Sequence, residues 1–586
     1  MSDEHQSDEK LSRVEHYKLA SRGLRGPIGI ELGQDAPAFS EEAVQLLKHH
    51  GAYQQDDRDT RTERKKAGLD RDYRMMVRTK FPAGTITAEQ YLLCDELADK
   101  YGQGDLRATS RQCFQFHGVV KRNLRPLVHD LNRLAEITTI GACGDVVRNT
   151  VACPVADIDP AFAECGANLI EMARRISAHF IPQTTAYYDL WLDDAKATVH
   201  EDGTVTFADD EPSGQPEDPI YGKAYLPRKF KIGVTVDFDN SCDIYTQDAG
   251  LIGVTENGRI IGWDVTAGGG LGYTHRKPKT YARLGSHIAF VPTEDVIGFV
   301  EAIVKVQRDH GGRSDRKHAR LKYLIDDWGL ERFREAVFEY AGRRYDPPRG
   351  VAPSAQPDYL GWRKQLQPGL NYVGVWIENG RIRDFDGGFQ FRTGLREIID
   401  RFRPSVRLTP HHNVVLANIP DDAVPEVRAL LDQYRIPTSE GISQLRRLEM
   451  ACPALPLCGL AMAEAERFMP RLMSELEAAG HGDADVILRI SGCPNNCSRP
   501  RTAEIGVIGC GADRYQLYTG GDYLGTRLNE LITEKLTGDQ LGPTIGALLT
   551  AWKAQREAGE RFGDWSARIG VDAIRALTET ESAATG

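Results

Sequence analysis

Alternating apolar and polar positions predict a compact set of strands and one helix early in the chain. Tyr73-Arg-Met-Met-Val-Arg-Thr-Lys-Phe81 has the pattern of a strand, and Thr87-Ala-Glu-Gln90 is a capping box that opens a helix through Tyr101. Two further short strands are expected at residues 105–109 and 113–119. Together these segments predict a small α+β layer.

Later segments alternate between helical periodicity and loop composition. We expect helices at residues 160–179, 293–340 and 460–479, and strands at residues 225–236 and 485–490. Loop composition marks three further stretches: residues 1–10 are expected to be disordered, residues 195–220 to form an acidic surface loop, and residues 347–357 to be a Pro-rich linker.

The second half of the chain repeats motifs of the first half in the same order. The segment that begins at Arg107 has a counterpart 300 residues later, and an Arg five residues before a Cys-Pro pair recurs with an offset of 299. Residues 229–233 resemble residues 488–492, and a Gly-Gly pair before Leu-Gly occurs at 268–269 and again at 520–521. Chance similarity is the alternative. This period is too long for a solenoid, so we expect two related halves about a pseudo-twofold axis.

Composition narrows the class of protein. A chain of 586 residues is too long for one hydrophobic core, so two or more domains are expected. A content of 41% hydrophobic and 27% charged residues is typical of a globular protein. The polar N-terminus lacks a signal core and no stretch approaches 18 apolar residues, so we expect a cytoplasmic protein without a membrane partner. The net charge of −11 argues against general nucleic-acid binding.

Four of the eleven cysteines form two closely spaced pairs, Cys452 with Cys458 and Cys493 with Cys497. Both pairs lie in turns that contain proline, next to expected regular elements. Four thiolates suit a [4Fe–4S] cluster or zinc. Gaps of five and three residues, with no His at finger spacing, favour the cluster. Unrelated buried cysteines and disulfides are the alternatives, and a reducing compartment disfavours disulfides.

Cations gather beside several of the predicted elements. Arg78, Arg107 and Arg111 fall within one small layer, which suggests an anion site rather than three surface residues. Lys229 and Lys231 would share one face of a strand, although a solvated turn is the alternative. The Gly268–Gly272 loop leads into Arg276, Lys277, Lys279 and Arg283, and it could grip carboxylates or phosphates or be an ordinary turn.

The cysteine region also resembles a known family. ACPALPLCGLAMAEAERFMP followed by SGCPNNCSRP is similar to the cluster signature of the sirohaem/[4Fe–4S] sulfite and nitrite reductases, most of all the haemoprotein (beta) subunit of assimilatory sulfite reductase. The resemblance extends from about Gly51 to Asp564. It implies an α+β fold of two pseudo-symmetric halves, each with a small ferredoxin-like half-domain and a larger α+β sirohaem or cluster domain.

The resemblance also implies a division of the chain into five parts. Residues 1–70 would be an N-terminal arm that wraps the core, 71–140 the first ferredoxin-like half-domain, and 141–345 the first sirohaem-binding domain. Residues 346–425 would hold the linker and the second half-domain, and residues 426–586 the second α+β domain with the [4Fe–4S] cluster.

Roles for individual residues follow from the same resemblance. It implies that Cys452, Cys458, Cys493 and Cys497 hold the cluster and that Cys497 is shared with the sirohaem iron. Arg107, Thr109, Arg111 and Gln115 match the family's cofactor-contact strand, and further carboxylate partners would be Arg228, Lys279, Arg283 and Arg527. Arg78, Arg148, Lys229 and Lys231 match the four cations of the substrate pocket. Four cations in one pocket would repel each other without an anion, so an anionic substrate is expected.

The implied activity is the reduction of sulfite to sulfide with six electrons and six protons, in assimilatory sulfur metabolism that leads to cysteine. Nitrite reduction to ammonia is the alternative, and the Lys229-x-Lys231 pair favours sulfite, because the nitrite enzymes usually have a neutral second residue. A non-catalytic four-cysteine zinc or redox scaffold is the alternative of another class.

Electrons are expected to come from another protein. The chain shows no flavin or NADPH fingerprint in the strand–Gly-x-Gly-x-x-Gly–helix context. The resemblance implies either an NADPH-dependent flavoprotein subunit or a ferredoxin as the donor.

Overall fold

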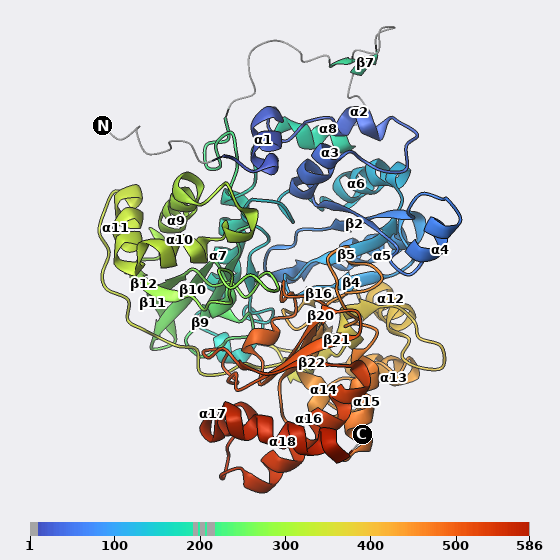
Figure 1. Ribbon diagram of the computed structural model, residues 1–586, viewed down its shortest axis with the longest axis vertical. Coiled ribbons are helices and arrows are strands. Elements are labelled where there is room, and N and C mark those ends of the chain that lie inside the picture. Colours follow the sequence, from blue (N-terminus) through green and yellow to red (C-terminus); the bar gives the residue numbers. More distant parts are fainter. Residues whose placement is uncertain (1–9, 192–196, 200–204, 208–216, 585–586) are drawn as a thin grey trace.

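The computed structural model describes residues 10–191, 197–199, 205–207 and 217–584 (Figure 1). Four five-stranded sheets form the framework of the described residues, and we call the two with fewer strand residues the small sheets. The first has the order β1 (Ala52–Asp56), β2 (Tyr73–Arg78), β5 (Phe114–Val119), β4 (Leu106–Ala108), β15 (Arg381–Ile382). The second has the order β13 (Gly361–Lys364), β14 (Leu370–Val375), β17 (Val414–Pro420), β16 (Ser405–Leu408), β3 (Thr85–Ile86).

The two small sheets exchange their edge strands. β15 comes from the second half of the chain but pairs with β4 of the first, with Arg381 opposite Arg107. β3 comes from the first half but pairs with β16 of the second, with Thr85 opposite Arg407. Because each half completes the sheet of the other, the two half-domains are joined by backbone hydrogen bonds.

Each small sheet has two helices at corresponding places in the chain. The first sheet has α5 (Ala88–Tyr101) and α6 (Lys121–Ala135), and the second has α12 (Phe391–Phe402) and α13 (Val424–Gln433). The capping box predicted for α5 is confirmed, since the Thr87 hydroxyl accepts from the Gln90 N–H and the Gln90 side chain accepts from the Thr87 N–H. These elements confirm the expected ferredoxin-like half-domains.

Two larger sheets repeat one topology. The first has the order β12 (Ser286–Val291), β11 (Arg259–Ala267), β10 (Ala249–Glu256), β9 (Ile232–Val236), β6 (Val151–Ala152). The second has the order β22 (Glu530–Leu536), β21 (Arg514–Thr519), β20 (Ile505–Gly511), β19 (Leu488–Ser491), β18 (Met450–Ala451). In both, three strands run parallel and two antiparallel strands follow. The predicted repeat is therefore present at the level of strand order.

Strand register refines the predicted repeat. Val151 lies opposite Gly233, and Met450 lies opposite Arg489, so β9 corresponds to β19 with an offset of 256. The match of residues 229–233 to 488–492 was therefore three residues out of register. The match of the Gly-Gly pairs is supported, because Gly268 and Gly520 follow equivalent strands and have φ values of +84° and +95°.

The remaining helices surround this framework (Figure 1). The arm carries α1 (Arg13–Ala20), α2 (Ile28–Leu32), α3 (Glu41–Leu47) and α4 (Arg61–Lys66). The first large domain carries α7 (Gly166–His179), α8 (Tyr188–Trp191), α9 (Val296–His310), α10 (Leu321–Trp328) and α11 (Leu330–Ala341). The C-terminal domain carries α14 (Gln444–Arg447), α15 (Met469–Ala478), α16 (Gly538–Gln555), α17 (Phe562–Ile569) and α18 (Val571–Ala584). Among the described residues, no helix is long and apolar enough to cross a membrane.

Two predicted helices were too long, and the helical stretch expected at residues 293–340 is divided into α9, α10 and α11. The helix expected from residue 160 begins only at Gly166, after a short 3₁₀ turn. The helix expected over residues 460–479 is limited to α15, because the amides of Met462 and Ala463 bind the Gly492 carbonyl instead of continuing a helix. Tertiary contacts with the cysteine loop thus override helix propensity.

The predicted loops are partly within the described region. Residues 347–357 contain no helix or strand, as expected of a linker. The expected loop at 195–220 lies largely outside the described residues, and its described parts include two short paired strands, β7 (Ala197–Val199) and β8 (Val205–Phe207). Disorder is expected at residues 1–10, and residues 1–9 lie outside the described region. The five-part division of the chain stays a proposal.

Candidate active site between the two halves

The four paired cysteines lie in two loops that are tied to each other. The Cys452 N–H bonds the Ile490 carbonyl at 3.2 Å, and the Gly492 N–H points at the Cys452 sulfur, also at 3.2 Å. Gly492 is required at this place, since a Cβ there would lie 2.6 Å from both Ala454 Cβ and the Ala463 carbonyl oxygen. Close backbone packing therefore fixes the first loop against the second.

Burial differs among the four thiols. Cys452 and Cys493 are buried, Cys458 is half-buried and Cys497 is exposed. Burial raises the pKa of the Cys452 thiol well above its ordinary value, and the neighbouring Cys497, Cys493 and Cys458 raise it further. Burial, then Cys497, raises the pKa of Cys493 to about 12. The four sulfurs are thus electrostatic neighbours, and a positively charged metal centre would be needed to hold them as thiolates.

Cys497 faces the first half of the chain. The Ser110 hydroxyl donates to the Cys497 carbonyl at 3.4 Å, and the Asn496 side chain donates to the Leu271 carbonyl at 2.8 Å. The Tyr273 N–H donates to the Pro494 carbonyl at 2.9 Å. The second cysteine loop is therefore hydrogen-bonded to two turns of the first half, residues 109–113 and the Gly268–Gly272 loop with the residue that follows it.

Four cations converge on the same region: Arg78, Arg148, Lys229 and Lys231. Arg78 ends β2, and Arg148 precedes β6, where its N–H bonds the Phe230 carbonyl at 2.9 Å. Phe230 is fully buried while both lysines around it are half-buried, so the lysines share the opposite face. Within the described parts of the chain, none of these four cations pairs with a carboxylate, which leaves their charge uncompensated.

The lysine pKa values report this crowding. Burial, followed by Arg111 and Arg320, lowers the pKa of Lys231 to about 7, while Cys497 opposes that shift. Burial, followed by Arg228 and Arg148, lowers the pKa of Lys229 well below its ordinary value. A bound anion would reverse both shifts, because opposite charge favours the protonated lysine.

A row of polar side chains crosses the first small sheet beside these cations. Arg78 lies opposite Gln115, Gln115 lies opposite Arg107, and Arg107 lies opposite Arg381. Residues directly opposite each other point to the same face of a sheet. Arg78 Nε and Gln115 Oε1 are buried without a hydrogen-bond partner, which indicates that this face is built to receive polar groups from outside the chain.

Comparisons with known proteins agree with this geometry. The family described as "Nitrite and sulphite reductase 4Fe-4S domain" matches residues 171–345 and 444–585, and the "Nitrite/Sulfite reductase ferredoxin-like half domain" matches residues 68–134 and 363–434. The chain belongs to the nitrite and sulfite reductase family that both descriptions name.

Relatives within the family cover nearly the whole chain. A sulfite reductase [ferredoxin] of Synechococcus elongatus is 42% identical over 98% of this chain and 92% of its own length. A sulfite reductase [NADPH] hemoprotein beta-component of Staphylococcus haemolyticus is 40% identical over 96% of each chain. The solved NirA protein of Mycobacterium tuberculosis has the same fold, with a TM-score of 0.75, 24% identity and 95% coverage of both chains.

The residues present fit the two cofactors of the sulfite and nitrite reductase family. The four neighbouring thiols form a set suited to a [4Fe–4S] cluster. The unpaired cations and partnerless polar atoms opposite Cys497 suit an acidic macrocycle such as sirohaem. Among the described residues, no three His, Cys, Asp or Glu side chains are placed to hold a single metal ion.

Several predicted cofactor contacts are engaged with protein groups. Arg107 forms a buried ion pair with Glu466 at 2.9 Å and donates to the Ala451 carbonyl, one residue before Cys452. Arg111 donates to the carbonyls of Asn149 and Ile232 and to the Gln247 side chain. The Thr109 hydroxyl accepts from the N–H groups of Arg111 and Cys113, so it shapes the turn that presents Arg111.

The four remaining predicted contacts have other surroundings. Arg283 pairs with Asp326 at 2.8 Å and bonds several carbonyls, and Arg527 pairs with Asp564 at 2.7 Å. Arg228 is half-buried and lies 3.8 Å from Asp145, and Lys279 is exposed. Nothing in these positions tests a contact with sirohaem, so all eight assignments stay predictions.

Sequence reasoning missed residues that organise the site. Glu466 accepts hydrogen bonds from Arg107 and Arg381. Burial raises the pKa of Glu466, but the two guanidinium groups outweigh burial and lower this pKa to about 2. The Tyr53 hydroxyl accepts from Arg148 at 3.3 Å. Lys322 is buried and donates to the carbonyls of Gly270 and Gly272, which braces the Gly268–Gly272 loop. Each looked like an ordinary charged or aromatic residue in the sequence, since only long-range contacts give it a role.

Proposed function

We propose that this protein reduces sulfite to sulfide at a sirohaem linked through Cys497 to a [4Fe–4S] cluster held by Cys452, Cys458, Cys493 and Cys497. One observation carries the proposal: Cys497, the exposed member of the four thiols, faces a group of cations that have no carboxylate partners in the described chain. A thiol at that place can serve the buried cluster on one side and an external iron on the other.

The substrate side is assigned to Arg78, Arg148, Lys229 and Lys231. Sulfite is a dianion with three oxygens, so it can accept hydrogen bonds from several of these groups at once. An Arg guanidinium can hold two sulfite oxygens in parallel, and Arg148 is held in place by its bonds to Tyr53 and the Gly144 carbonyl. When bound, sirohaem would supply the iron centre for substrate and the cluster would supply electrons singly.

Protons are assigned to the two lysines. Reduction of SO₃²⁻ to HS⁻ consumes six electrons and seven protons, and six of the protons leave in three water molecules. Burial and neighbouring arginines lower the pKa of Lys231, and a bound anion opposes that shift, so Lys231 can bind sulfite in its protonated form and release the proton as an oxygen departs. Lys231 and its neighbour Lys229 are therefore placed to donate hydrogen bonds and protons on the same side.

The choice of sulfite over nitrite rests on charge. Nitrite carries one charge and two oxygens, and it would leave more of this cationic group uncompensated than sulfite does. The relatives from Synechococcus elongatus and Staphylococcus haemolyticus are both named as sulfite reductases. The cysteine-biosynthetic role and the cytoplasmic location stay predictions from the sequence.

The donor of electrons is assigned to a separate protein. One relative is named for ferredoxin and the other for NADPH, with a beta-component that implies a partner subunit. The chain itself shows no dinucleotide fingerprint, so it must receive electrons across its surface.

Turnover with reduced methyl viologen, a small reductant that needs no docking site, tests the proposal. We expect sulfide from sulfite, a haem absorption spectrum, and iron and acid-labile sulfur consistent with one cluster and one sirohaem per chain. Nitrite turnover without sulfite turnover would assign the chain to the nitrite reductases. A colourless protein with one zinc per chain would instead support the scaffold alternative.

A further inference from the structure

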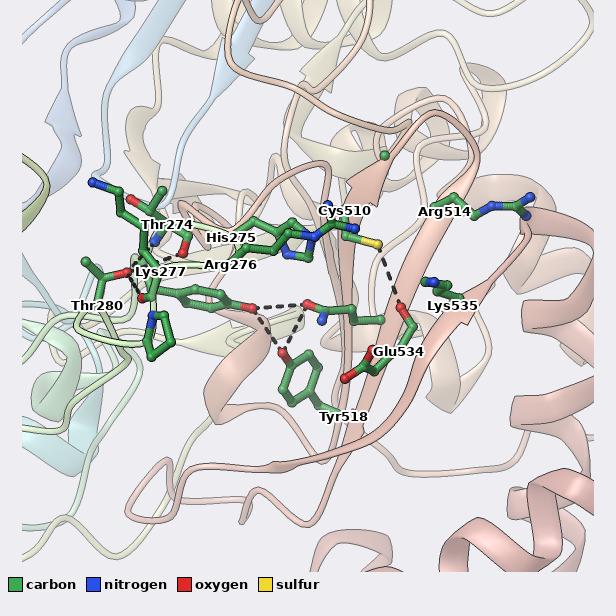
Figure 2. A pocket seen from close by; sticks show the side chains of 14 residues that line it. Thr274, His275, Arg276, Lys277, Thr280, Cys510, Arg514, Tyr518, Glu534 and Lys535 are labelled. Atoms are coloured by element: carbon green, nitrogen blue, oxygen red, sulfur yellow. Dashed lines mark hydrogen bonds between the residues drawn. The ribbon is translucent and has the colours of Figure 1, made fainter.

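An open cleft of about 870 Å³ lies beside the second cysteine loop, and we call it the basic cleft (Figure 2). One wall is the segment 273–280 that follows the Gly268–Gly272 loop, and the other is formed by β20, β21 and β22. Its lining residues are Tyr273, Thr274, His275, Arg276, Lys277, Pro278, Thr280, Cys510, Gly511, Arg514, Gln516, Tyr518, Glu534 and Lys535. The cleft thus lies between the two halves, but the roles proposed above do not use it.

The base of the basic cleft is a fixed polar network. The hydroxyls of Tyr273 and Tyr518 lie 3.0 Å apart, and both lie within hydrogen-bond distance of Gln516 Oε1, at 3.3 Å and 3.1 Å. Gln516 and Tyr518 are buried. This network joins the two walls, as Figure 2 shows, so the cleft has a defined width before any partner arrives.

The rim of the basic cleft is cationic on a protein whose net charge is −11. Four permanent cations line it against one carboxylate, Glu534. Arg276, Arg514 and Lys535 are exposed and have no carboxylate partner within the described residues, while Lys277 lies 3.8 Å from the exposed Asp315. Exposed cations facing one opening attract an acidic protein surface by long-range electrostatics.

The basic cleft abuts the cluster loop from both walls. From the first wall, Tyr273 donates its N–H to the carbonyl of Pro494, the neighbour of Cys493. From the second wall, Gly509 packs so closely that a Cβ there would lie 2.6 Å from the Gly492 carbonyl oxygen, and the next residue, Cys510, lines the cleft. A redox centre docked in this cleft would reach the Cys493 loop through wall residues that contact that loop, Tyr273 on one side and Gly509 beside Cys510 on the other.

We propose that the basic cleft is the docking site of an acidic ferredoxin, which passes electrons to the cluster across the Gly492–Pro494 segment. This inference rests on the proposed function. Each encounter would oxidise one reduced ferredoxin and deliver one electron, so six encounters serve one sulfite. A small acidic protein fits the observations better than a small anion, because the cations stand on the exposed rim while uncharged groups form the base.

A second route to the cluster competes with this assignment. Leu460 follows the first cysteine loop closely and is 68% exposed, so an apolar contact there could also admit a donor. Arg58 of the arm donates to the carbonyls of Cys458, Gly459 and Ala461 beneath it. We favour the basic cleft because an exposed single leucine carries no charge to steer an acidic partner.

The test compares the double variant Arg514→Glu, Lys535→Glu with the wild type. Ferredoxin binding and sulfite turnover are measured for both as holoproteins. We expect its Kd for reduced or oxidised plant-type ferredoxin, measured by calorimetry, to rise at least about tenfold at low salt. The KM for ferredoxin should rise in parallel, and added salt should narrow the difference by screening. Turnover with methyl viologen and the sirohaem content should stay at wild-type values. Arg122→Glu, a charge reversal at an exposed site on α6, is the matched control and should change none of these quantities.

Several results would overturn the inference. An unchanged ferredoxin Kd in the double variant would remove the basic cleft as a docking site. A loss confined to Leu460→Glu would move electron entry to the first cysteine loop, and a loss confined to turnover with an NADPH-dependent flavoprotein would assign the cleft to that donor instead. Weakened binding of inorganic phosphate with unchanged ferredoxin binding would make it a small-anion site. Wild-type protein without methyl viologen turnover of sulfite would refute the proposed function itself, which is a separate outcome.

Discussion

At the scale of single residues, the site is defined by charges that lack internal partners. Arg78, Arg148, Lys229 and Lys231 are buried or half-buried cations without carboxylates in the described chain, whereas Arg107 and Arg381 share the carboxylates of Glu466 and Asp105. Buried charges normally have partners. The unpaired group is therefore best explained by a partner from outside the chain, an anionic substrate and the acidic cofactor.

Lys231→Asn tests the substrate side. Each charge-assisted hydrogen bond to a bound anion contributes about 1.5–3 kcal/mol, so sulfite turnover should fall about ten- to a hundredfold. Nitrite turnover should fall less, because nitrite carries less charge. Steady-state rates for both anions measure this, with sirohaem content checked alongside. Lys223→Asn, an exposed lysine nearby in sequence, is the control. Equal losses for both anions would make Lys231 a general electrostatic residue, and loss of sirohaem would place it on the cofactor side.

Glu449, three residues before Cys452, allows a pH test of the same domain. Both of its carboxylate oxygens are buried without a hydrogen-bond partner, and burial raises its pKa to about 8 despite Arg446. The folded state then binds more protons than the unfolded state between the ordinary pKa and 8, so this group costs stability as pH rises through that window.

Glu449→Gln should remove that cost. We expect wild type and variant to unfold at similar temperatures at pH 5, and the variant to be more stable at pH 8.5, by up to about 5 kcal/mol at roughly 1.4 kcal/mol per pKa unit. Thermal unfolding at several pH values measures the difference. A difference that does not change with pH would show that Glu449 is ionised in the fold at pH 5 or has an ordinary pKa.

At the scale of elements, turns rather than regular structure hold the chemistry. Gly492 brings the two cysteine loops together, and Gly492→Ala should force its Cβ to within 2.6 Å of Ala454 and Ala463. We expect loss of most bound iron and of the cluster absorption. Gly459→Ala is a matched control beside Cys458, because a Cβ there meets nothing within 4 Å. Full iron content in Gly492→Ala would show that the loops can separate without losing the cluster.

Local signals made many of these elements predictable. The Thr87–Gln90 capping box, the linker at 347–357 and the pairing of cysteine turns with nearby elements all depend on a few consecutive residues. The end of the expected 460–479 helix was right, but its first turns are not helical, because Met462 and Ala463 bond Gly492 some 30 residues away. The exchange of β3 and β15 between halves was not predictable, since two-residue strands have no pattern of their own.

The candidate site was predictable in a similar way. Spacing identified the four cysteines, and the family resemblance identified the four cations expected in the substrate pocket. Sequence could not show that Arg107 donates hydrogen bonds to Glu466 and that Arg111 donates hydrogen bonds to backbone carbonyls. These partners lie more than 35 residues away in the chain. The sirohaem contacts therefore stay predictions from the family resemblance, whereas the structure brings the four cysteines close together.

At the scale of the whole molecule, the halves are joined by a buried charge triad. Asp243 of the first half binds Arg489 at 2.9 Å and Arg499 at 2.7 Å, and all three side chains are buried. Asp243→Asn keeps the side-chain shape and suits the local φ of +47°, but it would leave two arginines unpaired. We expect a loss of about 3–5 kcal/mol of unfolding free energy.

The control for this variant is an exposed ion pair that also joins distant segments. Asp59 lies 2.7 Å from Arg467, and both side chains are about half exposed. Asp59→Asn should change stability by no more than about 0.5 kcal/mol. Denaturant unfolding of both variants measures the contrast. Equal stability of the two variants would mean that the halves are held by apolar packing and strand exchange alone.

The most direct test of the account is the sulfite turnover of Cys497→Ser with reduced methyl viologen, compared with Cys94→Ser in the buried core of α5. We expect Cys497→Ser to lose nearly all sulfide formation and the native haem spectrum, because this thiol alone links the cluster to the substrate side. Cys94→Ser should retain both, since Cys94 is a buried core residue. A Cys497→Ser protein with native spectra and full sulfite turnover would show that Cys497 does not link the cluster to the haem.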